Sequence, residues 1–98
     1  MSAYVIVFAE EVIDPAEVGE YRRIALPTLL EHKPEMLLRM AKAETIEGPA
    51  VNGGVVLLRF PDLAAARAWY ESPTYQEALQ HRYKGAKCHA VIAADEAG

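Results

Sequence analysis

Apolar residues occupy nearly every position of the first segment, Ala3–Ala9, and their β-branched and aromatic side chains favour a strand. A different pattern starts at Asp14, where an N-cap residue precedes a proline and a glutamate follows three positions after the cap. Apolar residues then recur at helical spacing to about His32, which predicts a helix. Because Pro27 lacks an N–H for the carbonyl four residues earlier, we expect a kink or an early break there.

Two more apolar segments predict the middle of a sheet. Met36–Met40 opens a second strand, which we expect to extend through Ala43 to Ile46. Val55–Phe60 is a third strand, expected to be antiparallel to the second. Residues 48–54 contain three glycines and a proline, so this segment is a loop by composition, and its Gly-Gly pair indicates a turn.

The second half of the chain predicts two consecutive helices and a last strand. One helix starts after Asp62, and the next starts at Ser72, a natural N-cap followed by Pro73 at the first helical position. Gly85 is well placed as the C′ residue that ends this helix. His89–Ala94 is then the fourth strand.

The predicted order is therefore β-α-β-β-α-α-β, an α+β fold of the ferredoxin-like type with one split helix. Its four strands form an antiparallel sheet with all helices on one face. The chain has 98 residues, which suits one domain over residues 1–95, with residues 96–98 as a C-terminal tail.

The predicted strands are apolar on both sides, although helices cover only one face in this topology. In Tyr4–Ala9 and in Val55–Leu58, successive residues point to opposite faces and nearly all are apolar. We expect a second copy of the sheet to cover the free face in a homodimer. The alternative is a monomer with a partly exposed hydrophobic sheet, which is rare among soluble proteins.

Composition excludes several partners. The net charge of −4 argues against nucleic acid, because binding it needs a dense basic surface. No apolar run approaches the roughly 20 residues of a membrane span. The single cysteine, Cys88, excludes an internal disulfide and fits a reducing compartment, and the N-terminus has no signal-peptide pattern. We therefore expect a cytoplasmic protein.

Short motifs are spread over nearly the whole chain: Tyr21 with Pro27, Arg39 with Ile46-Glu47-Gly48, Phe60-Pro61, Ala68-Trp69-Tyr70, Ser72-Pro73-Thr74-Tyr75 and Arg82. In these motifs the chain resembles the domain-of-unknown-function family 1330, within the dimeric α/β-barrel superfamily. Two features depart from the family pattern: Met40-Ala41 replaces a Gly-Gly pair, and Arg59 replaces a glutamate. The superfamily includes cofactor-free monooxygenases, isomerases, dehalogenating and decarboxylating enzymes, and proteins without known activity, so the resemblance implies a dimeric barrel but selects no reaction.

Arg39 and Arg82 are the candidate ligand-binding residues. Arg39 interrupts an apolar strand, and a guanidinium inside a pocket needs an anionic partner. That partner is either a carboxylate of the chain or a carboxylate or enolate-like oxygen of a small ligand. The carboxylates considered are Glu44, Glu47 and Glu71. The tyrosines that could line the same pocket, with core packing as the alternative, are Tyr21, Tyr70 and Tyr75, while Trp69 is expected in the core.

Other chemistry has little support in the sequence. His32 and His81 fall near predicted helix C-termini, where the helix dipole favours a cation. His89 follows Cys88, but no second cluster completes a metal site. Ser72 serves as a cap, so serine catalysis is not expected. No glycine-rich phosphate loop occurs, and we expect no cofactor and no metal.

The residues together predict a small homodimer that binds a small organic, anionic molecule in a pocket between sheet and helices. Two alternatives stay open: a cofactor-free isomerase or monooxygenase, and a purely structural dimerisation module. The sequence does not decide whether the protein is an enzyme. No catalytic residue is assigned.

Overall fold

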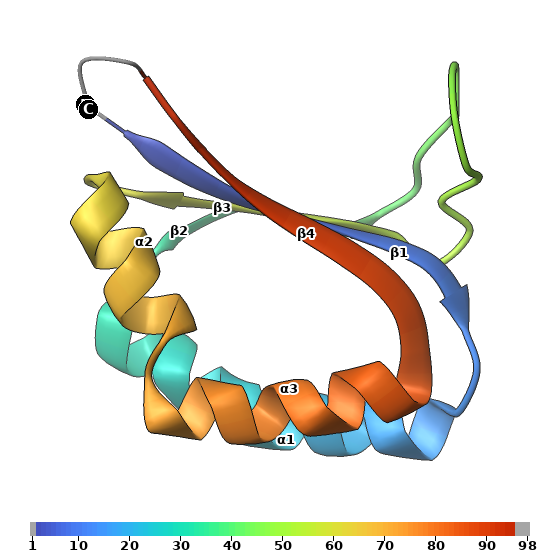
Figure 1. Cartoon of the computed structure of the whole chain (residues 1–98), viewed down its shortest axis with the longest axis horizontal. Coiled ribbons are helices and arrows are strands. Elements are labelled where there is room, and N and C mark those ends of the chain that lie inside the picture. The colour runs from blue at the N-terminus through green and yellow to red at the C-terminus, as the bar shows by residue number, and fades with distance from the viewer. Residues whose placement is uncertain (1, 96–98) are drawn as a thin grey trace.

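The computed structural model describes residues 2–95 and contains four strands and three helices in the predicted order (Figure 1). The expected tail, residues 96–98, lies outside the described residues. No helix in the described part is long and apolar enough to cross a membrane. The elements are β1 (Ala3–Val12), α1 (Pro15–His32), β2 (Glu35–Ala41), β3 (Gly54–Phe60), α2 (Leu63–Tyr70), α3 (Pro73–Gly85) and β4 (Ala86–Ala94).

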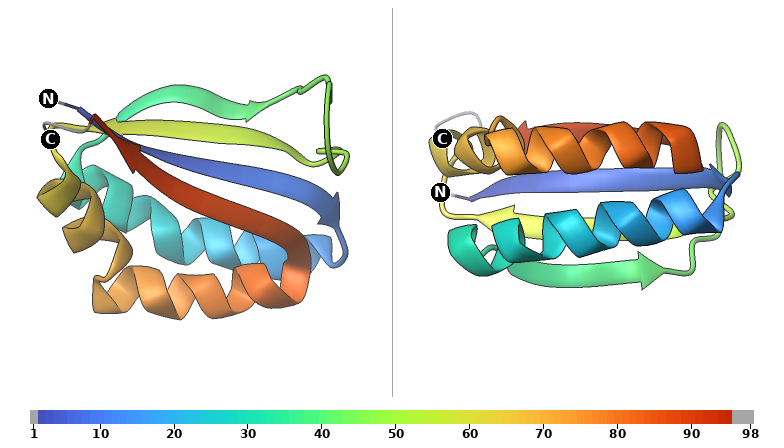
Figure 2. Two further views of the ribbon diagram at one scale, coloured as in Figure 1. Left: turned by 45° about the horizontal axis from the view of Figure 1, so that its top comes forward. Right: turned by 90° about the horizontal axis from the view of Figure 1, so that it is seen from below.

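The four strands form one antiparallel sheet in the order β2-β3-β1-β4. All three helices lie on one side of this sheet, with α1 and α3 running side by side beneath it (Figures 1 and 2). This arrangement confirms the predicted ferredoxin-like α+β fold. The face without helices is called the outer face below, and the face toward the helices the inner face.

Strand β1 separates the two faces most clearly. Its burial alternates, so that Val5 and Val7 are buried toward the helices while Ile6 and Phe8 point to the outer face and are half-buried. In register, Val5 lies opposite Leu58 of β3 and Ile6 opposite Leu57. The strand is apolar on both sides, and only its inner side is covered within the chain.

The core is built around Trp69 of α2, which is 2% exposed. Its indole Nε1 donates to Thr28 Oγ1 at 3.0 Å, and that hydroxyl in turn donates to the Ala25 carbonyl at 2.6 Å. The ring of Tyr75 packs on Trp69 with centroids 4.2 Å apart. These contacts join α1, α2 and α3, and they confirm Trp69 as a core residue.

The predicted helix starts are confirmed by their caps. Asp14 accepts from the Ala16 N–H at 3.0 Å, and Asp62 accepts from the Ala65 N–H at 2.8 Å. Ser72 accepts from the Tyr75 N–H at 3.4 Å while its own hydroxyl donates to the Trp69 carbonyl at 2.8 Å. Each side chain satisfies a backbone donor that has no partner within its helix.

The early break expected at Pro27 does not occur, because α1 continues to His32. Buried residues lie on both sides of the proline, at Ala25 and Thr28. Tertiary packing of this face holds the helix together despite one missing hydrogen bond.

The extension of the second strand to Ile46 is also wrong. Strand β2 ends at Ala41, directly after Met40, whose φ of 46° lies in the left-handed region. The pairing with β3 is already irregular here, with register shifts on both sides of Leu38. The left-handed residue turns the chain away from the ladder before residues 43–46 are reached.

Gly85 is not the C′ residue of α3 but its last helical residue. The following residue, Ala86, has an extended backbone and leads straight into β4. The glycine is needed for a different reason: a Cβ at this position would lie 2.8 Å from the Val18 nitrogen and 3.0 Å from the Asp14 carbonyl oxygen. It allows the end of α3 to touch the start of α1.

Candidate functional site

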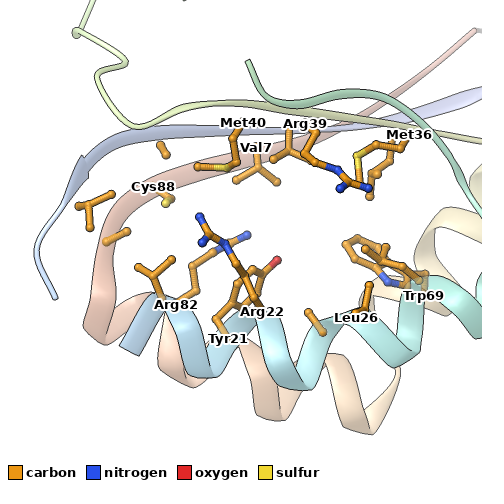
Figure 3. Close-up of a pocket in the computed structure, with 18 residues that line it drawn as sticks. Val7, Tyr21, Arg22, Leu26, Met36, Arg39, Met40, Trp69, Arg82 and Cys88 are labelled. Atoms are coloured by element: carbon orange, nitrogen blue, oxygen red, sulfur yellow. The ribbon is translucent and has the colours of Figure 1, made fainter. Parts of the chain in front are cut away.

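A cavity of about 310 Å³ lies between the inner face of the sheet and the helices (Figure 3). Its sheet-side wall includes Val7 and Leu58, and its helix-side wall includes Leu29 and Trp69. Ligand pockets commonly begin at about 300 Å³ and are mostly apolar with a few placed polar groups. The size and lining of this cavity match that pattern.

Three arginines enter this apolar cavity from different elements. Arg22 of α1 and Arg82 of α3 extend from the helices toward the sheet, while Arg39 of β2 comes from the opposite wall (Figure 3). Arg82 is only 7% exposed, whereas Arg22 and Arg39 are exposed. Arg82 therefore lies at the protected end of the cavity, and the other two lie at its solvent-facing side.

The chain has six arginines, and the three at the cavity are those without an ion pair in the described residues. Arg23 pairs with Glu20, Arg59 with Glu35 and Arg67 with Glu71. No carboxylate lines the cavity, and no ion pair within residues 2–95 involves its three arginines. The lining is thus strongly positive as well as apolar.

Arg82 is held by two tyrosines. Its Nη1 donates to the Tyr75 hydroxyl at 3.2 Å, and its Cζ lies 5.7 Å from the centre of the Tyr21 ring. The two tyrosine hydroxyls are 2.9 Å apart. Burial raises the pKa of Tyr75 far above its usual range, so this phenol stays protonated at all physiological pH values.

Cys88 of β4 also lines the cavity. Burial raises the pKa of its thiol, although the nearby Arg82 charge acts in the opposite direction. A raised pKa leaves less thiolate at neutral pH than an ordinary cysteine has. The thiol is therefore a neutral, weakly polar part of the wall.

The structure brings together Arg39, Arg82 and Tyr21 of the five predicted site residues, all on the cavity wall. Tyr75 lies behind Tyr21, 1% exposed, and reaches the site only through its hydroxyl. Tyr70 packs on Tyr75 with ring centroids 5.7 Å apart and does not line the cavity.

The carboxylates considered as structural partners lie elsewhere. Glu71 pairs with Arg67 at 3.5 Å, and Glu44 and Glu47 are exposed in the segment after β2.

Arg22 is the cavity residue that sequence reasoning missed as a candidate. The signal was present: Arg22 follows Val18 by four residues and precedes Ala25 by three, so it shares the helical face of these cavity-lining residues. In the sequence, Arg22 and Arg23 are adjacent and look like two solvent-exposed basic residues. Only the structure shows that Arg22 lines the cavity while Arg23 pairs with Glu20.

The three histidines lie outside the cavity lining. His81 Nδ1 lies 2.6 Å from Glu17 Oε2 and joins α3 to α1. His89 stacks on Phe8 with ring centroids 4.8 Å apart. His32 is in the last turn of α1, as predicted. Within the described residues, no group of three or more metal-ligating side chains is present.

The structure shows where the two departures from the family pattern lie. Arg59 faces away from the cavity, opposite Tyr4 of β1, and pairs with Glu35 of the neighbouring strand. Met40 keeps the left-handed backbone that glycine adopts easily. A Cβ on Gly54 would lie 3.0 Å from the Met40 carbonyl carbon, so the two backbones approach closely.

Comparison with protein families gives one match: the model of DUF1330, described as a domain of unknown function, covers residues 2–95. None of the curated proteins matches the chain in sequence. The chain is thus similar to a family over almost its whole length, and the family's description names no activity.

Solved structures with low sequence identity share the fold. A dimeric ferredoxin-like protein of unknown function from Jannaschia sp. CCS1 is 20% identical, with a TM-score of 0.68 over 96% of this chain and 99% of that one. A protein of unknown function from Rhodopseudomonas palustris is 17% identical, with a TM-score of 0.69 over 94% and 80%. SnoaB, a cofactor-independent oxygenase from Streptomyces nogalater, is 14% identical, with a TM-score of 0.62 over 97% and 92%.

Proposed function

The chain belongs to the DUF1330 family, and we propose that it binds a small organic anion in the cavity between its sheet and its helices. The observation that carries this proposal is the set of three arginines without ion pairs, Arg22, Arg39 and Arg82, around an apolar cavity that has no carboxylate in its lining. Positive charges that share one apolar cavity repel one another unless an anion lies between them.

The ligand has an apolar body with a single acidic group. The cavity wall is aliphatic and aromatic except for the arginines, Tyr21 and Cys88. Contact between a hydrophobic body and that wall stabilises binding by about 25 cal/mol per Å² of apolar surface removed from water. A highly charged metabolite would leave most of its polar surface without partners there.

We also propose that the protein is a homodimer joined through the outer face of the sheet. Ile6, Phe8 and Leu57 point to that face and are half-buried, and Val91 is 45% exposed. The Jannaschia neighbour is described as dimeric, which supports the same assembly for this fold. A cytoplasmic location is part of the proposal and is supported by the free Cys88 thiol.

Binding without turnover is favoured over an enzyme. Most side-chain acid–base catalysis uses a histidine or a carboxylate, and neither lines the cavity. SnoaB, one structural neighbour, is a cofactor-independent oxygenase, which keeps oxygen chemistry as the alternative. A purely structural module has no need of a cavity and would be expected to have a packed interior, so the cavity favours ligand binding over this alternative.

The single tryptophan offers a direct test, because Trp69 lines the cavity. Benzoate and benzamide have nearly the same size, but only benzoate is charged. Quenching of Trp69 fluorescence should show benzoate binding about tenfold or more tightly than benzamide, as expected for a charged group against a neutral one. Arg39→Gln should reduce this preference.

Arg67→Gln is the matched control, because Arg67 pairs with Glu71 on α2 and does not line the cavity. This variant should keep the preference for benzoate. Equal binding of the two compounds by the parent protein would contradict the proposal. Incubation of the bound compound in aerobic buffer, followed by NMR, separates binding from oxygenation: an unchanged spectrum is expected.

A further inference from the structure

Arg82 is a buried charge that the protein itself leaves incompletely satisfied. It is 7% exposed, its Nε is buried without a hydrogen-bond partner, and none of the described carboxylates pairs with it. Among the described residues, Nη1 of Arg82 donates to the Tyr75 hydroxyl at 3.2 Å. A buried guanidinium in this state needs an anion from outside the chain.

The direction of the hydrogen bonds around Arg82 follows from the donors available. Tyr75 accepts from Arg82, and its own buried O–H needs an acceptor. The Tyr21 hydroxyl, 2.9 Å away, is the acceptor that the described structure provides. Tyr75 therefore donates to Tyr21, and the chain of donors runs from Arg82 through Tyr75 to Tyr21.

This direction leaves the O–H of Tyr21 unused at the cavity wall. Tyr21 lines the cavity, and its ring lies beside the Arg82 guanidinium, with 5.7 Å between the ring centre and Cζ. Figure 3 shows the side chains of Tyr21 and Arg82 extending from the helices toward the sheet. Polarisation along a chain of hydrogen bonds strengthens its last donor.

We infer that Tyr21 and Arg82 together bind one anionic oxygen, of the phenolate or enolate type, at the protected end of the cavity. This inference rests on the proposed function and adds the chemical class of the ligand to it. A hydroxyl donor and a guanidinium from different elements converge on a single oxygen. A carboxylate instead favours two parallel bonds from one guanidinium, and in Arg82 the nitrogen Nη1 already donates to Tyr75.

It follows that the protein binds an acidic phenol or enol as its conjugate base. An apolar cavity without these donors would favour the neutral form and raise the pKa of the bound compound. The Tyr21 hydroxyl and the Arg82 guanidinium instead stabilise the anion and lower the pKa of the bound compound. The direction of the shift therefore distinguishes a cavity that contains an oxyanion site from one that is merely hydrophobic.

4-Nitrophenol is a suitable probe, because it ionises near neutral pH and its anion absorbs at a separate wavelength. Its absorbance is titrated against pH with and without an excess of the parent protein. The apparent pKa should fall by about one unit or more, since a tenfold preference for the anion corresponds to one unit.

Tyr21→Phe tests the hydroxyl while keeping the ring. It should weaken nitrophenolate binding about tenfold, the usual scale for a hydrogen bond to a charged group, and leave binding of the neutral phenol unchanged. Because it leaves the Tyr75 O–H without an acceptor, the double variant with Tyr21→Phe and Tyr75→Phe is measured beside it. Tyr83→Phe is the control, since Tyr83 is exposed on α3 and does not line the cavity.

Each outcome decides the matter. A lowered pKa that is lost in Tyr21→Phe and also in the double variant supports the inference. A lowered pKa that persists in both variants overturns the role of Tyr21, while the proposed anion binding stands. A raised pKa, or no binding of either form by the parent protein, overturns the inference, and the benzoate comparison then decides whether the proposed anion binding stands.

Discussion

Met40 has a left-handed backbone with φ of 46°, at the point where β2 ends and beside the mouth of the cavity. Such a conformation costs about 1–2 kcal/mol for a residue with a Cβ. Its backbone is also close to Gly54 at the start of β3. Met40 therefore lines the cavity although its backbone conformation lowers the stability of the protein.

A comparison of two substitutions isolates that backbone cost. Met40→Ala removes the side chain but keeps the Cβ, whereas Met40→Gly removes the Cβ as well. We expect the glycine variant to have the higher free energy of unfolding of the two, by about 1 kcal/mol, because glycine adopts positive φ without strain. Chemical denaturation followed by Trp69 fluorescence measures the difference.

Ala41→Gly is the control for this comparison. Ala41 is the last residue of β2 and has no positive φ, so glycine should lower stability there by about 0.5–1 kcal/mol. If Met40→Gly were also less stable than Met40→Ala, the left-handed conformation would not carry the cost described.

At the scale of elements, the end of α3 contacts the start of α1. The N–H groups of Ile13 and Asp14 both donate to the Gly85 carbonyl, at 2.7 and 2.9 Å. The missing side chain of Gly85 makes room for the backbone of Val18 and Asp14. This junction fixes the two helices that present Tyr21 and Arg82 to the cavity.

Gly85→Ala should therefore disrupt the junction. The added Cβ would lie 2.8 Å from the Val18 nitrogen and 2.9 Å from its Cγ2, closer than real Cβ contacts. We expect a loss of about 1–3 kcal/mol in the free energy of unfolding, the usual range for overpacking. Thermal and urea denaturation measure it.

Gly19→Ala provides the opposite case on the neighbouring helix. A Cβ on Gly19 meets nothing within 4 Å, and the residue is exposed inside α1. Alanine is the better helix former, so this variant should gain about 0.5–1 kcal/mol. Equal changes in the free energy of unfolding for Gly85→Ala and Gly19→Ala would show that α1 and α3 do not touch as described.

For the whole molecule, the uncovered outer face is the main consequence of the fold. All helices lie on one side of the sheet (Figure 2), yet the outer side of β1 and β3 is apolar at Ile6, Phe8 and Leu57, with Arg59 at one end. An interface of standard size buries about 1,600 Å² in total. The proposed dimer would cover this face with a second sheet and leave the cavities on the helix side.

Leu57→Asp tests that assembly. Leu57 points to the outer face opposite Ile6, so a carboxylate there would be buried without a partner in the dimer. Light scattering at micromolar concentration should give twice the 10.8 kDa chain mass for the parent protein and the single mass for this variant.

Leu30→Asp is the control, because Leu30 is 68% exposed on α1, away from the sheet. It should remain dimeric. A parent protein of 10.8 kDa, or a Leu57→Asp variant that still doubles its mass, would contradict an interface through the outer face.

The sequence by itself determined the order of elements and where the helices begin. Asp14, Asp62 and Ser72 cap their helices through bonds to residues two or three positions away, so these signals are local. The apolar character of both sides of β1 was also visible. The family followed from the same local motifs.

Only the tertiary structure decided where β2 ends and what surrounds Arg82. The end of β2 depends on the backbone of Met40 against Gly54, which no propensity specifies. Tyr21 and Tyr75 are 54 positions apart, yet their hydroxyls meet beside Arg82. Contacts at that separation arise from packing, and packing also brought Arg22 into the site while the neighbouring Arg23 pairs with Glu20 at the surface.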